Sequence, residues 1–315
     1  EDEGMAKIGY LLPTRERVME GRHETAPLLA LAERAEGLGF DSLWAGDSLL
    51  ARPRHEPLTL LAAVAARTTK AELGTAVLLP ALRNPVILAH MAATVDRISE
   101  GRLILGVGIA TDVPNVRAEF AAAGVPFEKR VGRMMEGLRL CRALWSGEDT
   151  EWEGRWQVAG GALGPTPHRR GGPPIWGAAS APAGLKRTAR SFDGWFPIGP
   201  TPDVLGERWA DVRGLAREAG RNPDDLTFAV YLTLAIDDDP AAADRRIDAY
   251  LENYYGQPGP VMRRLQACFG GDAAGAADWL RSYADAGASH IVLRLVGDHE
   301  RQMDQVAAIR QRLGW

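Results

Sequence analysis

The sequence LGTAVLLPALRNPVILAHMAATVDRISEGRLILGVGIA, residues 73–110, contains two apolar, strand-like segments separated by one helix. The first segment, 72–79, is aliphatic and β-branched and ends at Pro80. The second, 102–107, follows a glycine that ends the helix. Because a single crossover helix joins them, the two strands run parallel, and the stretch is predicted to be a βαβ unit.

The helix of this unit has a clear start and a predicted apolar face. Asn84 is a good N-cap residue, and Pro85 takes the first helical position, where its missing N–H leaves no bond unmade. Gly106 and Gly108 mark the carboxyl end of the second strand, where parallel α/β proteins place their ligands. Hydrophobic residues recur at helical spacing and predict the buried face of the helix, namely Ile87, Met91, Val95 and Ile98.

Strands and helices alternate along the rest of the chain. Further strands are predicted at 7–12, 41–45, 174–177, 194–197, 227–236 and 290–296, and helices around 27–36, 57–68, 129–145, 182–190 and 300–313. Eight strands alternating with helices favour an α/β fold of the (β/α)8 TIM barrel type over an open doubly wound sheet. We interpret 1–315 as one domain with insertions near 146–174, where a hairpin is expected at 150–158, and near 254–271, where an irregular region is expected.

Composition argues against several functional classes. A chain of 315 residues with a formal net charge of −4 and a pI near 5.9 gives no basis for a nucleic-acid partner. The histidines are scattered without metal-ligand spacing, so no metal site is expected. No membrane-spanning run or secretion signal is recognised, which predicts a cytoplasmic protein. Cys141 falls on an apolar helical face and is expected to be a buried thiol.

Six segments, in this order and spacing, resemble the luciferase-like monooxygenase superfamily of flavin and deazaflavin oxidoreductases, and most closely its F420-dependent branch. They are GLGFDSLWAGDSLL (37–50), TTKAELGTAVLLPALRNP (68–85), TVDRISEGRLILGVGIA (94–110), RVGRMMEGLRLCRALWSG (130–147), GGPPIWGAASAPAGLKRTARSFDGWFP (171–197) and AGASHIVLRL (286–295). The resemblance implies a bacterial-luciferase-like (β/α)8 barrel with an isoalloxazine-type ring over the carboxyl ends of the strands.

Asp47 and Ser48 follow the second strand, at the predicted mouth of the barrel. F420-dependent members of the family often carry Asp-His here, so the resemblance implies that Asp47 lies beside the ring and that Ser48 replaces a histidine near the reacting carbon. Both are candidate catalytic residues; alternatively, Asp47 only caps the following turn. Because the most obvious proton-transfer group is missing, a sugar-phosphate dehydrogenase mechanism does not carry over directly.

The resemblance also assigns cofactor-binding roles to both ends of the stretch 73–110. Ala76 and Val77 correspond to a non-prolyl cis peptide that backs the ring in many relatives; the alternative is an ordinary buried strand. Gly106, Gly108 and Ile109 would lie beside the ring through close backbone approach. They are not a dinucleotide fingerprint, because the third glycine and the downstream acidic residue are absent.

Related F420 enzymes place an acid and an asparagine shortly after this strand. In this chain Thr111, Asp112 and Asn115 occupy that stretch. Thr111 and Asp112 are candidate catalytic residues near the substrate, and Asn115 is a candidate cofactor ligand. The alternative is a solvated loop.

A phosphate site is predicted where a strand turns into the helix at 182–190. Both FMN and F420 carry a phosphate, and the relatives bind it at this turn, where free backbone N–H groups and the helix dipole favour an anion. The alternative is a plain turn with a serine N-cap. Trp176 is expected in the wall of the cofactor site or in the core. The residues predicted to bind the phosphate are Gly177, Ala178, Ala179 and Ser180.

These features predict an oxidoreductase that transfers a hydride between F420 and a small organic substrate, with the chemistry supplied by the cofactor. The alternative is an FMN-dependent two-component monooxygenase that receives electrons from a separate reductase and uses O2. A flavin-binding protein without turnover is a third hypothesis. The sequence does not identify the substrate, and the resemblance implies a homodimer.

Overall fold

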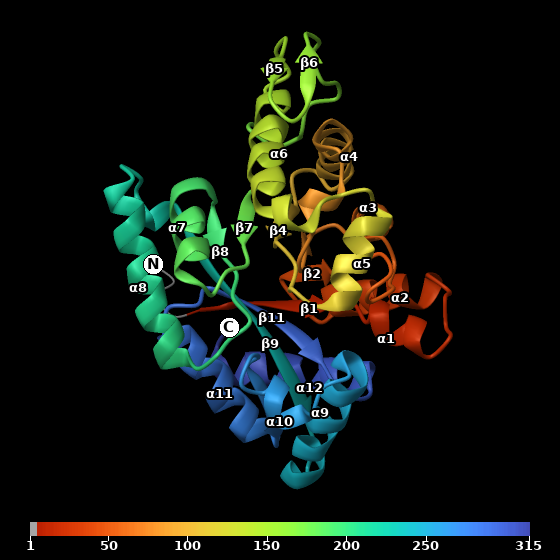
Figure 1. Cartoon of the computed structure of the whole chain (residues 1–315). Coiled ribbons are helices and arrows are strands. Elements are labelled where there is room, and N and C mark those ends of the chain that lie inside the picture. The colour runs from red at the N-terminus through yellow and green to blue at the C-terminus, as the bar shows by residue number, and fades with distance from the viewer. Residues whose placement is uncertain (1–4) are drawn as a thin grey trace.

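Eight parallel strands of the computed structural model, which describes residues 5–315, follow one another around a closed barrel (Figure 1). Each strand pairs with its neighbour in chain order, and the last strand returns to the first. The TIM barrel predicted from the strand–helix alternation is therefore confirmed. The barrel strands are β1 (Lys7–Leu11), β2 (Ser42–Ala45), β3 (Glu72–Thr75), β4 (Leu103–Val107), β7 (Ile175–Gly177), β8 (Gly194–Trp195), β9 (Thr227–Ile236) and β11 (His290–Leu295).

Helices cover the outside of the barrel. The sequence patterns did not identify α8, α9 or α11, which complete the alternation after β8, β9 and β10. The helices are α1 (Thr14–Met19), α2 (Ala26–Gly37), α3 (Pro57–Arg67), α4 (Pro85–Ile98), α5 (Pro114–Ala122), α6 (Arg130–Leu144), α7 (Pro182–Ser191), α8 (Pro202–Glu218), α9 (Pro240–Tyr255), α10 (Gly259–Met262), α11 (Ala273–Asp285) and α12 (His299–Leu313).

The βαβ unit is present, but its first strand is shorter than predicted. β3 ends at Thr75, whereas the sequence predicted a strand as far as residue 79. Beyond Thr75 the backbone leaves the regular ladder: the Ala76 amide donates to the Ala45 carbonyl on one side, and the Leu78 amide donates to the Gly106 carbonyl on the other. The residues after β3 therefore form a bulge at the carboxyl end of the barrel.

The predicted apolar face of α4 is confirmed at Val95 and Met91 but wrong at its two isoleucines. Ile87 and Ile98 are exposed, at 60% and 44%. The buried face instead carries mostly small side chains, because α4 packs closely between α3 and α6. Alanine gives a weak hydrophobic signal in the sequence but permits this close helix approach. The buried residues on the helix include Leu88, Ala89, Ala92, Ala93 and Val95.

The interior of the barrel is filled by aromatic rings. Trp44 lies 5.5 Å from the Trp176 ring and 5.1 Å from the Phe196 ring, measured between centroids. The Trp44 indole lies directly against Gly74 of the neighbouring strand, where any added Cβ would overlap it. The barrel is therefore packed at its centre, and open space remains only at its ends.

The two predicted insertions have different structures. In the first, the expected hairpin is present as β5 (Glu151–Glu153) and β6 (Gln157–Ala159), which project beyond the end of α6 (Figure 1). The second was expected to be irregular, and this is wrong. It contains α10 and a ninth strand of the main sheet, β10 (Cys268–Gly271), which pairs with β9. Cys141 is buried, as predicted, and its thiol lies 3.3 Å from the Pro85 carbonyl.

No helix among residues 5–315 combines the length and apolar character needed to cross a bilayer.

Candidate active site

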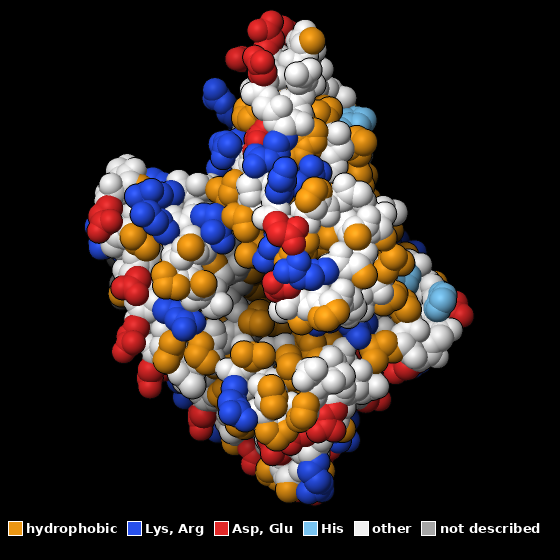
Figure 2. All heavy atoms as spheres, in the orientation of Figure 1, with side chains coloured by type: hydrophobic (Ala, Val, Ile, Leu, Met, Phe, Trp, Pro, Cys, Tyr) orange, Lys and Arg blue, Asp and Glu red, His pale blue; other side chains and the backbone are white. Residues whose placement is uncertain are grey.

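A cavity of about 410 Å3 opens at the carboxyl ends of the barrel strands. Figure 2 shows it as the hollow near the centre of this face, with mostly hydrophobic side chains around its rim. This is the end of a TIM barrel at which ligands bind. Ten of the predicted site residues line the cavity: Asp47, Ser48, Ala76, Val77, Gly108, Ile109, Thr111, Ala178, Ala179 and Ser180.

One wall of the cavity is built from small side chains. The peptide bond between Ala76 and Val77 is cis, as the resemblance implied. Gly108 lies beside this bulge, and a Cβ added there would come within 2.8 Å of a Val77 methyl group. Ala178 contributes the adjoining surface. With no long side chain projecting from it, this wall leaves room for a planar ring.

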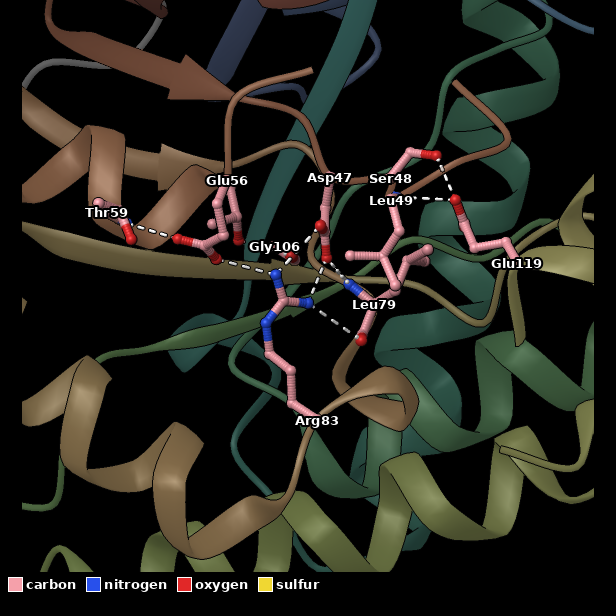
Figure 3. Close-up of polar contacts among 10 residues, drawn as sticks. Asp47, Ser48, Leu49, Glu56, Thr59, Leu79, Arg83, Gly106 and Glu119 are labelled. Atoms are coloured by element: carbon pink, nitrogen blue, oxygen red, sulfur yellow. Dashed lines mark hydrogen bonds and ion pairs between the residues drawn. The ribbon is translucent and has the colours of Figure 1, made fainter. Parts of the chain in front are cut away.

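Asp47 joins the loop after β2 to the loop after β3 (Figure 3). Its side chain is 1% exposed and accepts hydrogen bonds from the Leu79 amide at 2.9 Å and from two nitrogens of Arg83 at 2.5 and 3.1 Å. Arg83 also donates to Glu56 at 2.9 Å. Burial lowers the pKa of Arg83, but the hydrogen bonds and charges of the two carboxylates outweigh burial and raise it. Asp47 thus fixes the bulge that carries the cis peptide.

Glu119 fixes the loop after β2 (Figure 3). This carboxylate on α5 is 1% exposed. A single oxygen, Oε2, accepts hydrogen bonds from the Ser48 hydroxyl at 2.7 Å and from the amides of Leu49, Leu50 and Ala51 at 2.7, 2.7 and 2.9 Å. The Ser48 hydroxyl, which stands where a histidine was expected, is therefore committed to holding the loop. No sequence motif pointed to Glu119 or to Arg83.

The start of α7 lies at the cavity, as predicted for a phosphate site. Ala181, rather than Ser180, is the N-cap residue, and it has no capping side chain. Arg187, one and a half turns into the helix, also lines the cavity. Burial lowers the pKa of its guanidinium, and no carboxylate among residues 5–315 forms an ion pair with it. An uncompensated, half-buried cation beside a helix N-terminus suits an anionic group.

Five predicted site residues do not line the cavity. Asp112 is exposed and paired with Arg117 at 2.6 Å, and Asn115 is exposed and donates to the Ala51 carbonyl at 3.3 Å. These positions fit the solvated-loop alternative. Trp176 belongs to the barrel interior. The other two, Gly106 and Gly177, are buried and allow close packing behind the cavity, against Thr75 and Phe192 respectively.

The opposite side of the cavity was missed entirely by the sequence patterns. It is formed by Tyr231 of β9, Tyr254 and Tyr255 at the end of α9, and Gln266 ahead of β10. Behind them lies Arg294 of β11, which is 1% exposed. The spacing of Tyr250 and Tyr254, four residues apart as on one face of a helix, is a signal that could have pointed to this side.

Among residues 5–315, no group of three or more His, Cys, Asp or Glu side chains is arranged to hold a metal ion.

A family model described as luciferase-like monooxygenase matches residues 6–315. An F420-dependent glucose-6-phosphate dehydrogenase of Mycolicibacterium gilvum is 34% identical over 227 residues, which cover 69% of this chain and 66% of the relative. A protein of the same description from Intrasporangium calvum is 31% identical over 308 residues, which cover 87% of this chain and 90% of the relative.

Two solved structures share the fold over almost the whole chain. Monooxygenase RslO1 from Streptomyces bottropensis superposes with a TM-score of 0.84 at 25% identity, covering 98% of this chain and 100% of that one. An F420-dependent secondary alcohol dehydrogenase, solved with an F420–acetone adduct, superposes with a TM-score of 0.82 at 20% identity, covering 97% and 98%.

Proposed function

Because this chain belongs to the luciferase-like monooxygenase family, we propose that it is an oxidoreductase that transfers a hydride between coenzyme F420 and a small organic substrate. The choice of F420 rests on the sequence similarity to F420-dependent dehydrogenases, which extends along most of the chain. The cavity supports it, since a wall of small side chains adjoins a helix start with an uncompensated arginine.

Each part of the cavity suits one part of the cofactor. The deazaflavin ring of bound F420 accepts or gives up a hydride at one carbon, and its side chain carries a phosphate. Ala76, Val77 and Gly108 would support the ring from behind. Ala179, Ser180 and Arg187 would hold the phosphate. The Asp47 carboxylate is engaged by Leu79 and Arg83, so its role would be to position the bulge.

The substrate would occupy the space between the ring and the tyrosine side of the cavity. Two relatives are named for glucose 6-phosphate, and this chain differs from the expected Asp-His motif at Ser48, whose hydroxyl is bound to Glu119. Glucose 6-phosphate is therefore one substrate to test, together with simple secondary alcohols. FMN use with O2 and a separate reductase is the alternative, favoured by the likeness to monooxygenase RslO1.

Titration of the purified protein with F420 and with FMN, followed by fluorescence, distinguishes these cofactors. We expect saturable, submicromolar binding of F420 and no comparable binding of FMN, because the sequence similarity to F420-dependent dehydrogenases extends along most of the chain. Submicromolar binding of FMN with no binding of F420 would contradict the proposal and favour the monooxygenase. Loss of F420 absorbance on addition of glucose 6-phosphate or a secondary alcohol would then identify the substrate class.

Replacing Arg187 with alanine should weaken F420 binding by about 10-fold or more, because a charge-assisted hydrogen bond contributes roughly 1.5–3 kcal/mol. Arg190→Ala is the matched control, since Arg190 lies on the same helix but is exposed. Both dissociation constants are measured by the same fluorescence titration at low and high salt. Equal effects of the two substitutions would place the phosphate elsewhere.

We also propose that the protein acts in the cytoplasm as a homodimer. The exposed side chains of Ile87 and Ile98 on α4 support self-association, because a second copy would remove them from water.

A further inference from the structure

Tyr255 lines the cavity, and a buried arginine donates a hydrogen bond to its phenol oxygen. Arg294 donates a hydrogen bond from Nη1 to the Tyr255 oxygen at 2.8 Å. Its other nitrogens donate to Gln266 at 2.6 Å and to the Thr233 hydroxyl at 3.0 Å. Because all three contacts use Arg294 as the donor, the Tyr255 oxygen accepts this bond, and its own proton stays available to a ligand in the cavity.

The charge of Arg294 is not neutralised by a carboxylate. No Asp or Glu within residues 5–315 forms an ion pair with it, although the side chain is almost fully buried. Tyrosine rings surround the guanidinium instead, with the centroids of Tyr231, Tyr250, Tyr254 and Tyr255 at 5.3, 5.2, 5.0 and 5.5 Å. A buried cation without a counter-ion favours ionisation of the group to which it donates.

The tyrosines of this cluster respond differently to the same cation. Burial raises the pKa of Tyr231 and of Tyr250 well above the ordinary value. Burial acts on Tyr255 in the same direction, but the Arg294 charge and the hydrogen-bonding side chains of Arg294 and Gln266 outweigh it and lower the Tyr255 pKa. Tyr250 also donates its proton to Glu16 at 2.5 Å, so it is not free to act in the cavity.

Cations outnumber carboxylates around Tyr255. The Arg52 guanidinium lies 5.0 Å from its ring centroid, and Arg15 stacks on the neighbouring Tyr254 at 4.3 Å. The nearest carboxylate of the cluster, Glu16, is bound to Tyr250. The titratable and charged groups of the cluster around Tyr255 and Arg294 come from β11, β9, β10, α9, α1 and the loop after β2. They are Arg294, Tyr231, Cys268, Tyr250, Tyr254, Arg15, Glu16, Arg52 and Arg54.

We propose that Tyr255 is the residue that exchanges a proton with the substrate oxygen, and that Arg294 is the positioning residue that holds the Tyr255 oxygen. The proposal rests on the proposed hydride transfer to F420. On oxidation of an alcohol, the O–H bond breaks and its proton passes to the Tyr255 oxygen. The adjacent C–H bond breaks and its electron pair leaves with the hydrogen to the cofactor, so the carbon becomes a carbonyl carbon. Reduction of a carbonyl reverses both transfers.

Two other polar groups at the cavity are already engaged. The Ser48 hydroxyl donates to Glu119, and the Asp47 carboxylate accepts from Arg83 and Leu79. Tyr255 would therefore take the proton-transfer role of the histidine that is missing after Asp47.

Tyr255→Phe should lower kcat by about 100-fold or more, the range of general acid–base catalysis, and leave the F420 dissociation constant unchanged. Tyr250→Phe, on the same helix beside the same arginine, is the matched control and should retain activity.

In the direction of alcohol oxidation, the activity of the wild type should rise with pH through the Tyr255 pKa, because the phenolate is the base. Arg294→Lys should shift this rise to higher pH, since lysine keeps the positive charge but lacks the planar guanidinium group and its fixed hydrogen-bond donors.

A second readout requires neither substrate nor cofactor. Titration of the free protein, followed by the ultraviolet absorbance of phenolate, should show one tyrosine that ionises below the others. That step should be absent from Tyr255→Phe and present in Tyr250→Phe. Absence of the step from the wild type, or wild-type turnover by Tyr255→Phe, would overturn the proposal. Failure to bind F420 would instead overturn the proposed function and would leave the phenolate titration to decide the role of Tyr255.

Discussion

Replacing Asp47 with alanine should lower the free energy of unfolding by about 3–5 kcal/mol, the usual cost of removing one partner from a buried ion pair. The Asp47 carboxylate is 1% exposed and Arg83 is 14% exposed, so little water can replace the lost contacts. The Leu79 amide would also lose its acceptor. Urea denaturation followed by circular dichroism measures the change.

The matched control for this substitution is a surface pair. The exposed side chains of Glu33 and Arg67 form an ion pair with two hydrogen bonds, at 2.7 and 3.1 Å. Glu33→Ala should therefore change the free energy of unfolding by no more than about 1 kcal/mol. If Asp47→Ala lowered the free energy of unfolding by no more than Glu33→Ala does, the buried Asp47–Arg83 pair would contribute no more to stability than an exposed pair. Asp47→Ala should also abolish saturable F420 binding under conditions where the protein stays folded, because the bulge after β3 loses its anchor.

Replacing Glu119 with alanine should release the loop after β2 while leaving the barrel folded. Four donors would lose their shared acceptor, and leaving even two of them unsatisfied costs about 2–6 kcal/mol locally. Amide hydrogen exchange at Leu49, Leu50 and Ala51 should therefore accelerate by about 100-fold.

Two further variants separate the causes of this effect. Glu119→Gln keeps an oxygen at the same place and should accelerate exchange less than Glu119→Ala does. Glu128→Ala removes an exposed carboxylate that pairs with Arg117 and should leave exchange in the loop unchanged. Unchanged exchange in Glu119→Ala would mean that the loop is held by other contacts.

The barrel could be predicted from the sequence because its signals are local. Each strand is a short apolar run, and caps such as Asn84, whose side chain accepts from the Val86 amide at 2.9 Å, mark the helix starts. The apolar face of α4 was predicted wrongly in part, for a related reason. Large side chains such as Ile87 dominate a hydrophobic pattern, whereas close helix packing selects small ones such as Ala89.

The site could be predicted only in part, because its decisive contacts join distant residues. The resemblance identified Asp47 and the cis peptide at Ala76, but not the partner of Asp47, which lies 36 positions away. Glu119 and Ser48 are 71 positions apart, and Tyr255 and Arg294 are 39 apart. No helical or strand period links such pairs, so a single sequence carries no signal for them.

The carboxylates of Asp47 and Glu119 tie three successive loops into one unit: the loop after β4 carries α5, whose Glu119 holds the loop after β2, and Asp47 in that loop holds the bulge after β3. The part of the cavity mouth that these loops form should tolerate few substitutions, because a substitution in one loop also displaces the other two. The tyrosine side is joined to this unit by the contact of Arg52 with the Tyr255 ring, whereas the segment after β8 is not. Evolution toward a new substrate, in nature or by library selection, should therefore find its tolerated variation first beyond β8, around Ile198, and only later in the three linked loops.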